Sequence, residues 1–526
     1  MSHASPTFEG LVARAVERFL QSAVVVDDRA FLPSAMRPTR LRTPGPEAEM
    51  LAEIEEEEKE QEQEQVSNSE VSDPANTPLN AKEIVDAFAA RGVVCGVLRP
   101  SADATDEVRR VAPRAIRRSD LVIVDWHLYG DDGEATIALL EDVLQEAGAA
   151  MRLVAIYTGD PDLPRVARKL MERLGGASID ETSVEIGAAR IVVIGKADPD
   201  APKEGAVSEG DLPNRLVELY AALADGLVRA TALSALGALR GATYRLLAGL
   251  GPEIDLGYVG QRALVYPSSE AEDHLLGMLI SELRAIIEDD EETRACTDGD
   301  AVALWLERES EDGRGGRISP EALAAAVETD PYDADSVRAL HESHAEFNAI
   351  NLKKGLTEHI APTTEAAKAA DERFAMRMTL KLVYQRPERI LSIGTIVARS
   401  DGSYWLCIQP ACDSLRVKGS RRFPFVPLTV STSRVDYVID DGDETTYLHL
   451  SRKPADIEHW TFKADPKYRA VVAKGDPPAF VSTGRRRFRW VGQLNEAHAH
   501  RAAQEVGAEQ SRIGLAESDW LRRMPK

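Results

Sequence analysis

Five short runs of apolar residues, separated by helical patterns, recur through the first 200 residues. They cover residues 23–26, 93–98, 121–124, 152–157 and 190–195. The run Leu-Val-Ile-Val at 121–124 is apolar at every position, which is typical of a strand buried on both faces of a parallel sheet. Amphipathic segments of helical period lie between the runs, and this alternation favours strand–helix–strand units. The sequence therefore predicts an α/β domain with a doubly wound, five-stranded parallel sheet.

Polar side chains follow four of these runs directly. They are Asp27 and Asp28, Asp125, Thr158 and Lys196. Because the carboxyl ends of parallel strands meet at one edge of a sheet, we expect these side chains to lie close together. Three carboxylates with one lysine suit a Mg²⁺ site, since Mg²⁺ takes oxygen ligands and leaves positions for phosphate oxygens. We expect Asp125 to attack a phosphoryl group and become an acyl phosphate, with Thr158 and Lys196 holding the phosphate oxygens.

The segment 20–200 resembles the receiver domain of bacterial two-component response regulators. The resemblance rests on the acidic pair Asp27-Asp28, the loop from Asp125 to the Asp-Gly pair at 132–133, and Thr158 and Lys196 after the last two strands. It implies a flavodoxin-like fold with Asp125 as the phosphoacceptor. It also implies that Thr158 and Lys196 read the phosphoryl group.

The same resemblance implies the metal ligands and the partner. Mg²⁺ would be bound by Asp27, Asp28 and Asp125, with the backbone carbonyl of His127. The segment is similar to divergent receivers of bacterial conflict and phage-defence operons, which are paired with a histidine-kinase-like ATPase. We therefore expect a phosphorelay protein of two-component type that takes its phosphoryl group from such a partner.

Four departures from the family pattern concern switching rather than phosphorylation. One is Ala197, which stands where a proline usually follows the family's lysine. An insertion at 32–77 separates the first strand from its helix, and the segment between Thr158 and Lys196 is longer than usual. Val192, Val193 and Ile194 fill the last strand, where the family often has an aromatic switch residue. An alternative function is therefore a pseudo-receiver, an interaction scaffold that is not phosphorylated.

Composition divides the chain further. The insertion contains the acidic run 55–65 and cannot bury a core, so we expect disorder or a solvated helix there. We expect a receiver-like domain at 1–200, a helical domain at 201–375, and a mainly-β domain with a C-terminal helix at 376–526. Within the last of these, we expect short apolar runs to be strands, among them 379–384 and 468–473. The chain has a net charge of −24, yet residues 377–526 contain 25 basic and 17 acidic side chains, a net charge of +8.

The basic C-terminal segment permits a second alternative, a nucleic-acid-directed effector. Arg485, Arg486, Arg487 and Arg489 lie in one short run with the interleaved aromatic residues Phe488 and Trp490, a composition that suits phosphate contacts with base stacking. The competing interpretation is a docking surface for the acidic front half. We identify no independent catalytic centre, and the oligomeric state is left open.

No apolar run approaches the 18 residues of a membrane-spanning helix, and the N-terminus lacks the apolar core of a signal peptide. Four cysteines without paired metal spacing are typical of a reducing compartment. We therefore expect a cytoplasmic protein without membrane contact.

Overall fold

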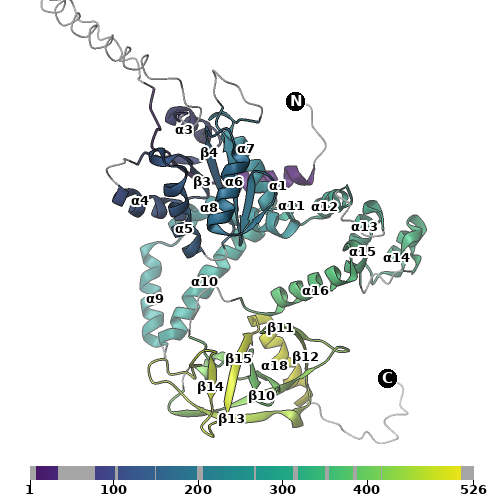
Figure 1. Ribbon diagram of the computed structural model, residues 1–526. Coiled ribbons are helices and arrows are strands. Elements are labelled where there is room, and N and C mark those ends of the chain that lie inside the picture. The colour runs from purple at the N-terminus through teal and green to yellow at the C-terminus, as the bar shows by residue number, and fades with distance from the viewer. Residues whose placement is uncertain are drawn as a thin grey trace, which may run out of the picture. The chain divides into compact units, whose positions relative to one another are not determined.

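The computed structural model describes residues 7–33, 77–100, 105–147, 150–197, 205–265, 268–311, 318–349, 355–382, 388–415, 417–442 and 444–510 (Figure 1). Residues 34–76, which include the acidic run, lie outside this set. The chain forms two compact units, Met1–Ala248 with Glu282–Trp305, and Gly249–Ser281 with Leu306–Lys526. These units are defined by how compactly the chain packs, whereas the three domains expected from sequence were defined by composition. The three domain ranges therefore stay a prediction.

The first unit is built on a sheet whose parallel core has five strands. They are β1 (Ser22–Val26), β2 (Val94–Leu98), β3 (Leu121–Val124), β4 (Arg152–Thr158) and β7 (Ala189–Gly195). Their order across the sheet is β2-β1-β3-β4-β7, and every neighbouring pair is parallel. This is the 2-1-3-4-5 order of flavodoxin-like folds, so the predicted fold class is confirmed.

A hairpin that the sequence pattern did not predict extends this sheet to seven strands. β6 (Ser183–Ile186) pairs antiparallel with β7, and β5 (Ala177–Ser178) pairs with β6. The turn into β7 begins at Gly187, which has a φ of +62°, a conformation that glycine adopts without steric cost. The hairpin accounts for the long segment between Thr158 and Lys196.

Helices cover both faces of the sheet. One buried cluster joins it to α1 (Phe8–Phe19), α3 (Ala81–Ala89) and α7 (Leu212–Leu223). The other joins it to α4 (Thr105–Arg118), α5 (Glu134–Ala147) and α6 (Leu163–Leu174). Because successive strand side chains point to opposite faces, Val25 and Ile123 enter the first cluster while Val24 and Val122 enter the second. This double burial is why the strands read as unbroken apolar runs.

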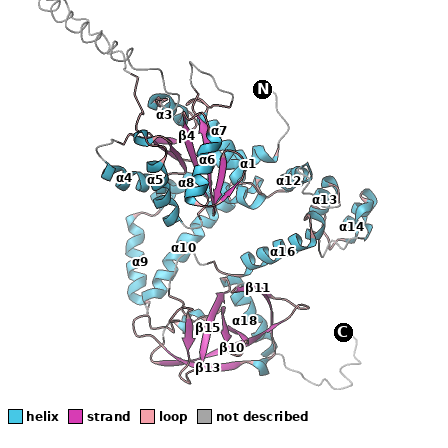
Figure 2. Cartoon of the chain, viewed as in Figure 1, coloured by secondary structure: helices cyan, strands magenta, loops and turns pink. Residues whose placement is uncertain are grey.

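The described residues between the two sheets are helical, as expected from sequence (Figure 2). The helices are α8 (Leu227–Gly249), α9 (Pro252–Leu264), α10 (Ser268–Glu288), α11 (Glu291–Ala295), α12 (Gly299–Glu311), α13 (Pro320–Val327), α14 (Ala334–Ser343), α15 (Thr357–Ile360) and α16 (Thr364–Thr379). Within the first unit, Asp290 caps α11 and forms an ion pair with Arg18 of α1. This contact, mainly through its hydrogen bonds, lowers the pKa of Asp290 below the usual range.

The second unit ends in an antiparallel β domain. Its strands are β8 (Thr395–Arg399), β9 (Tyr404–Cys407), β10 (Ser420–Val430), β11 (Tyr437–Asp441), β12 (Glu444–Leu450), β13 (Glu458–Lys463), β14 (Ala479–Val481) and β15 (Arg487–Gln493). They are ordered β11-β12-β10-β9-β8-β15-β14, with β13 also paired to β10. The helix α18 (Glu496–Gln510) follows. Aromatic side chains form much of the core, among them Phe423, Phe425, Trp460, Phe462 and Phe488.

Two strands expected in this domain are wrong. Residues 468–473 form only isolated bridges, and α16 continues to Thr379, where a strand was expected to begin. Short apolar runs are ambiguous between element types, and these two are resolved by pairing partners distant in sequence. Among the described residues, we find no helix with the length and apolar character needed to span a bilayer.

Candidate functional site

The parallel register brings the polar strand ends together at the carboxyl edge of the sheet. Thr158, the last residue of β4, lies opposite Gly195 of β7, and its carbonyl accepts the Lys196 N–H at 2.7 Å. The Asp125 N–H donates to the Val26 carbonyl at 2.9 Å, which places the ends of β1 and β3 side by side. The expected gathering of these residues therefore follows from strand pairing alone.

Lys196 is the centre of this cluster. Its Nζ donates to Asp27 Oδ2 at 2.7 Å and to Asp125 Oδ1 at 2.8 Å, and its side chain is 2% exposed. Burial disfavours the ammonium, but the two carboxylates outweigh it and raise the pKa of Lys196 above its usual range. The lysine therefore stays charged and neutralises part of a buried acidic pair.

Asp125 is held at both carboxylate oxygens. Oδ1 accepts from Lys196, and Oδ2 accepts the backbone N–H of His127 at 2.8 Å. Burial raises the pKa of Asp125, the negative charge of Asp27 raises it further, and Lys196 opposes both. The backbone carbonyl of Asp125 accepts a hydrogen bond of 2.7 Å from the Thr136 hydroxyl. The carboxylate is thus fixed in direction while it remains adjacent to a cation.

The acidic pair after β1 has an unsatisfied oxygen. Asp28 Oδ2 accepts the Tyr129 N–H at 3.0 Å, but Asp28 Oδ1 is buried and makes no hydrogen bond to the described residues. Asp27 Oδ1 accepts the Arg29 N–H at 2.8 Å. A buried oxygen without a partner costs free energy that a bound cation would recover.

The donor set fits Mg²⁺, because carboxylate and carbonyl oxygens are its usual ligands. It would be held by Asp27, Asp28 and Asp125, with the His127 carbonyl, which accepts from Gly130 at 3.0 Å and keeps a second lone pair. No group of three or more His, Cys, Asp or Glu side chains in the described ranges already has the spacing of an ion site. The Lys196 ammonium lies between two of these carboxylates instead.

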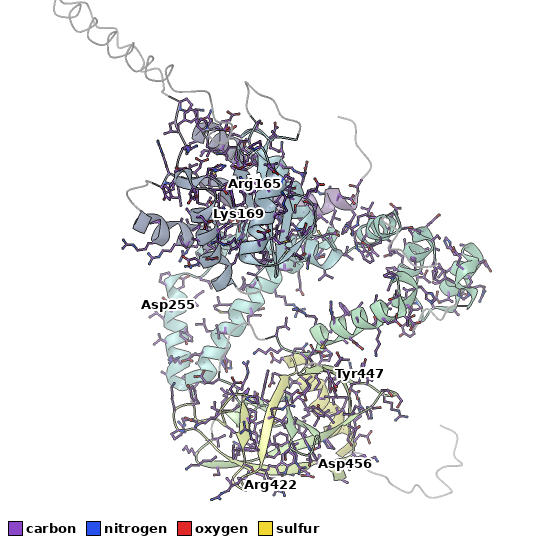
Figure 3. The ribbon with its side chains drawn as sticks, viewed as in Figure 1. Arg165, Lys169, Asp255, Arg422, Tyr447 and Asp456 are labelled. Atoms are coloured by element: carbon purple, nitrogen blue, oxygen red, sulfur yellow. The ribbon has the colours of Figure 1, made fainter. Side chains whose placement is uncertain are left out.

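A second set of contacts ties the loop after β3 to the loop after β4. Thr158 is fully buried, and its hydroxyl accepts the Asp160 N–H at 3.1 Å. The Asp160 carboxylate lies 3.2 Å from His127 Nε2 and accepts from Arg165 at 2.6 Å. Arg165 and Lys169, labelled in Figure 3, extend from α6 to the side chain of Asp132. Sequence reasoning missed Asp160 and Arg165, although the position of Asp160 two residues after Thr158 was a usable signal.

The loop from Asp125 to Gly133 depends on a close packing contact. Trp126 is buried, and its Nε1 donates to Asp132 at 3.2 Å. Gly133 has a φ of +83°, and a Cβ there would lie 2.2 Å from the Trp126 ring. The Asp-Gly ending of the loop is therefore a steric requirement of this fold.

We expect Gly133→Ala to lower the free energy of opening of this unit by about 2–3 kcal/mol, from left-handed strain and the clash with Trp126. Hydrogen exchange of the β3 and α5 amides measures it. Gly92→Ala is the control, because Gly92 has a φ of +74° but no atom within 4 Å of an added Cβ. If the two changes lowered the free energy of opening equally, the contact between Gly133 and Trp126 would contribute nothing to the stability of this unit.

An aromatic residue lies beside the site, but on β4 rather than on the last strand. Tyr157 is buried, and its ring centroid is 5.7 Å from Lys196 Nζ. Its hydroxyl donates to the Val207 carbonyl at 2.7 Å, and burial raises its pKa. Val207 also forms a bridge with Lys196. Tyr157 thus connects the lysine to the segment that leads into α7, a connection the sequence did not reveal.

The basic residues expected to contact nucleic acid have different environments. Arg489 forms two hydrogen bonds of 2.6 Å with Asp441, so it is a structural ion pair. Arg485 and Arg486 are exposed, and Arg487 is exposed with one donor bound to the Pro477 carbonyl. The interleaved Phe488 is fully buried. The interpretation of interleaved aromatics as a stacking surface is therefore corrected for Phe488, which is core.

Residues 19–200 match the family model described as the response receiver domain. Comparison with curated proteins and with solved structures gave no match.

Proposed function

From the premise that residues 19–200 are a response receiver domain, we propose that Asp125 accepts a phosphoryl group in a Mg²⁺-dependent reaction. The observation that carries this proposal is the buried Lys196 between Asp27 and Asp125, with Thr158 on the adjacent strand end. Two carboxylates and an ammonium at one edge, beside the unsatisfied Asp28 oxygen, suit the binding of a metal-bound phosphate group.

The reaction is an in-line displacement. A carboxylate oxygen of Asp125 attacks the phosphorus atom, an O–P bond forms, and the bond to the donor breaks with its electron pair on the donor. Lys196 and the Thr158 hydroxyl contact the transferred oxygens, and the His127 N–H orients the attacking carboxylate. When bound, Mg²⁺ supplies positive charge for the phosphoryl oxygens.

The wider role is signalling. We propose that a histidine-kinase-like ATPase is the donor, and that the helical region and the β domain carry the output. The Tyr157 contacts support a route for that output, because they join Lys196 to the chain entering α7. A role in phage defence rests on the resemblance of the receiver segment alone.

Metal removal tests the proposed chemistry. Incubation with radiolabelled acetyl phosphate and Mg²⁺ is expected to label the protein, with hydroxylamine releasing the label, and EDTA is expected to abolish labelling. Asp28→Asn should raise the Mg²⁺ concentration for half-maximal labelling by about tenfold, because one charged ligand is removed. Label that forms equally in EDTA, or resists hydroxylamine, would contradict the proposal.

A second candidate is the unphosphorylated pseudo-receiver scaffold. The observation that favours it is the closed ion cluster, in which the Lys196 ammonium pairs with both Asp27 and Asp125. In that case the kinase-like partner binds wild type and Asp125→Asn with equal affinity, and neither protein takes up label.

A further inference from the structure

A strip of basic side chains crosses one face of the β domain. β10 and β13 pair with Ser420 opposite Lys463 and Arg422 opposite Thr461. The alternate positions on these strands, Phe423 with Trp460, enter the core, so Arg422 and Lys463 point outward. Figure 3 labels Arg422 on this domain.

The hairpin between β14 and β15 continues the strip. The Thr483 N–H donates to the Thr461 carbonyl at 2.8 Å, which places this hairpin beside β13. Arg485 and Arg486 lie in its turn, and Arg487 pairs with the exposed Val481. We call Arg422, Lys463, Arg485, Arg486 and Arg487 the basic strip; all five are exposed.

The charge of the strip is uncompensated. None of these five side chains has a carboxylate of a described residue within 4.0 Å, whereas neighbouring Arg421 pairs with Asp413 and Arg489 with Asp441. The outward positions along β10 and β13 from Ser420 to Pro424 and from His459 to Lys463 carry no carboxylate. In a chain with a net charge of −24, such a face is a specific local excess of positive charge.

We propose that the basic strip binds the phosphate backbone of a nucleic acid. Four strands spaced about 4.8 Å apart make the strip about 14 Å wide, which matches about four phosphates of one strand. Hydroxyl side chains adjoin the cations, because Ser420 lies opposite Lys463, Thr461 lies opposite Arg422, and Thr483 lies beside Thr461. Arg, Lys, Ser and Thr are the usual phosphate contacts. In the described part of the chain, Val481 is the only large hydrophobic residue at the strip that is markedly exposed. Binding to an anionic membrane surface would require more exposed apolar area than this one side chain offers.

The buried aromatics determine the kind of recognition. Phe423, Trp460, Phe462 and Phe488 lie in the core beneath the strip and offer no ring for base stacking. Binding is therefore electrostatic, depends steeply on salt, and varies little with base composition.

Fluorescence anisotropy of the full chain with a labelled single-stranded oligonucleotide tests the proposal. Arg422→Ala/Lys463→Ala/Arg485→Ala is expected to weaken binding at least tenfold at low salt. The slope of log affinity against log salt should fall by about 2, which is about 0.7 for each phosphate that the variant no longer neutralises. Oligonucleotides of different base composition should bind alike.

The control is Arg377→Ala/Arg434→Ala/Lys453→Ala, which removes the same charges from exposed positions away from the strip. It should bind as wild type does, and unchanged circular dichroism should show that both variants are folded. An equal weakening in the control, no binding by wild type at low salt, or binding to anionic vesicles but not to the oligonucleotide would overturn the proposal. Labelling of Asp125 is measured separately and should be the same in both variants.

Discussion

Asp125→Asn is expected to abolish phosphoryl labelling by acetyl phosphate and Mg²⁺. The amide keeps the size of the carboxylate and can still accept from the His127 N–H. It lacks the anionic oxygen that attacks phosphorus, so no acyl phosphate forms. The readout is hydroxylamine-labile label per molecule, measured with the full chain.

Asp142→Asn is the matched control, because Asp142 is an exposed aspartate on α5 of the same unit. It should be labelled as fully as wild type. Hydroxylamine-labile label that persists in Asp125→Asn would assign the phosphoacceptor to another carboxylate and refute the proposed function. Because the amide also leaves Lys196 with one carboxylate partner, hydrogen exchange of β3 should accompany the assay to show that the fold is retained.

Lys196→Met is expected to lower the free energy of opening of the receiver sheet by about 3–5 kcal/mol in EDTA. Removing the ammonium leaves Asp27 and Asp125 as a buried, unpaired acidic pair, and breaking a buried ion pair from one side has a cost of this size. Hydrogen exchange of the β1, β3 and β7 amides measures this change within the first unit. A local measurement is needed because the global unfolding of a chain with two compact units would not be two-state.

Mg²⁺ should recover more stability in Lys196→Met than in wild type, because the cation would replace the missing positive charge.

The pKa of Lys196 is raised in the folded state, so the folded protein binds this proton more tightly than the unfolded chain. Its contribution is fully present below the ordinary pKa of 10.5 and is lost as pH rises through the folded pKa. The difference between wild type and variant should therefore persist across neutral pH.

Lys169→Met is the control for this change. Lys169 pairs with Asp132, but its side chain is 25% exposed, so its removal should cost at most about 1 kcal/mol. A destabilisation by Lys196→Met no larger than that of Lys169→Met would show that the buried cluster does not hold the strand ends together.

The sequence revealed the sheet and its polar edge because both depend on local pattern. Residues 121–124 are buried on both faces and so are apolar throughout, and parallel pairing carries whatever follows each strand to the same edge. The β5–β6 hairpin was not predicted, since Ala177 and Ser178 are exposed and its register depends on pairing with β7. The two wrong strands in the β domain have the same origin.

By itself, then, the sequence determined the fold class and indicated that Asp27, Asp125, Thr158 and Lys196 lie at one edge of the sheet. Only the tertiary structure decided how those groups are partnered: Lys196 between two carboxylates, Asp28 with an unsatisfied oxygen, Arg489 neutralised by Asp441. The physical reason is that burial and strand pairing act through periodic patterns that a chain carries locally. Ion pairs and unsatisfied atoms arise between side chains far apart in sequence, and no local pattern records them.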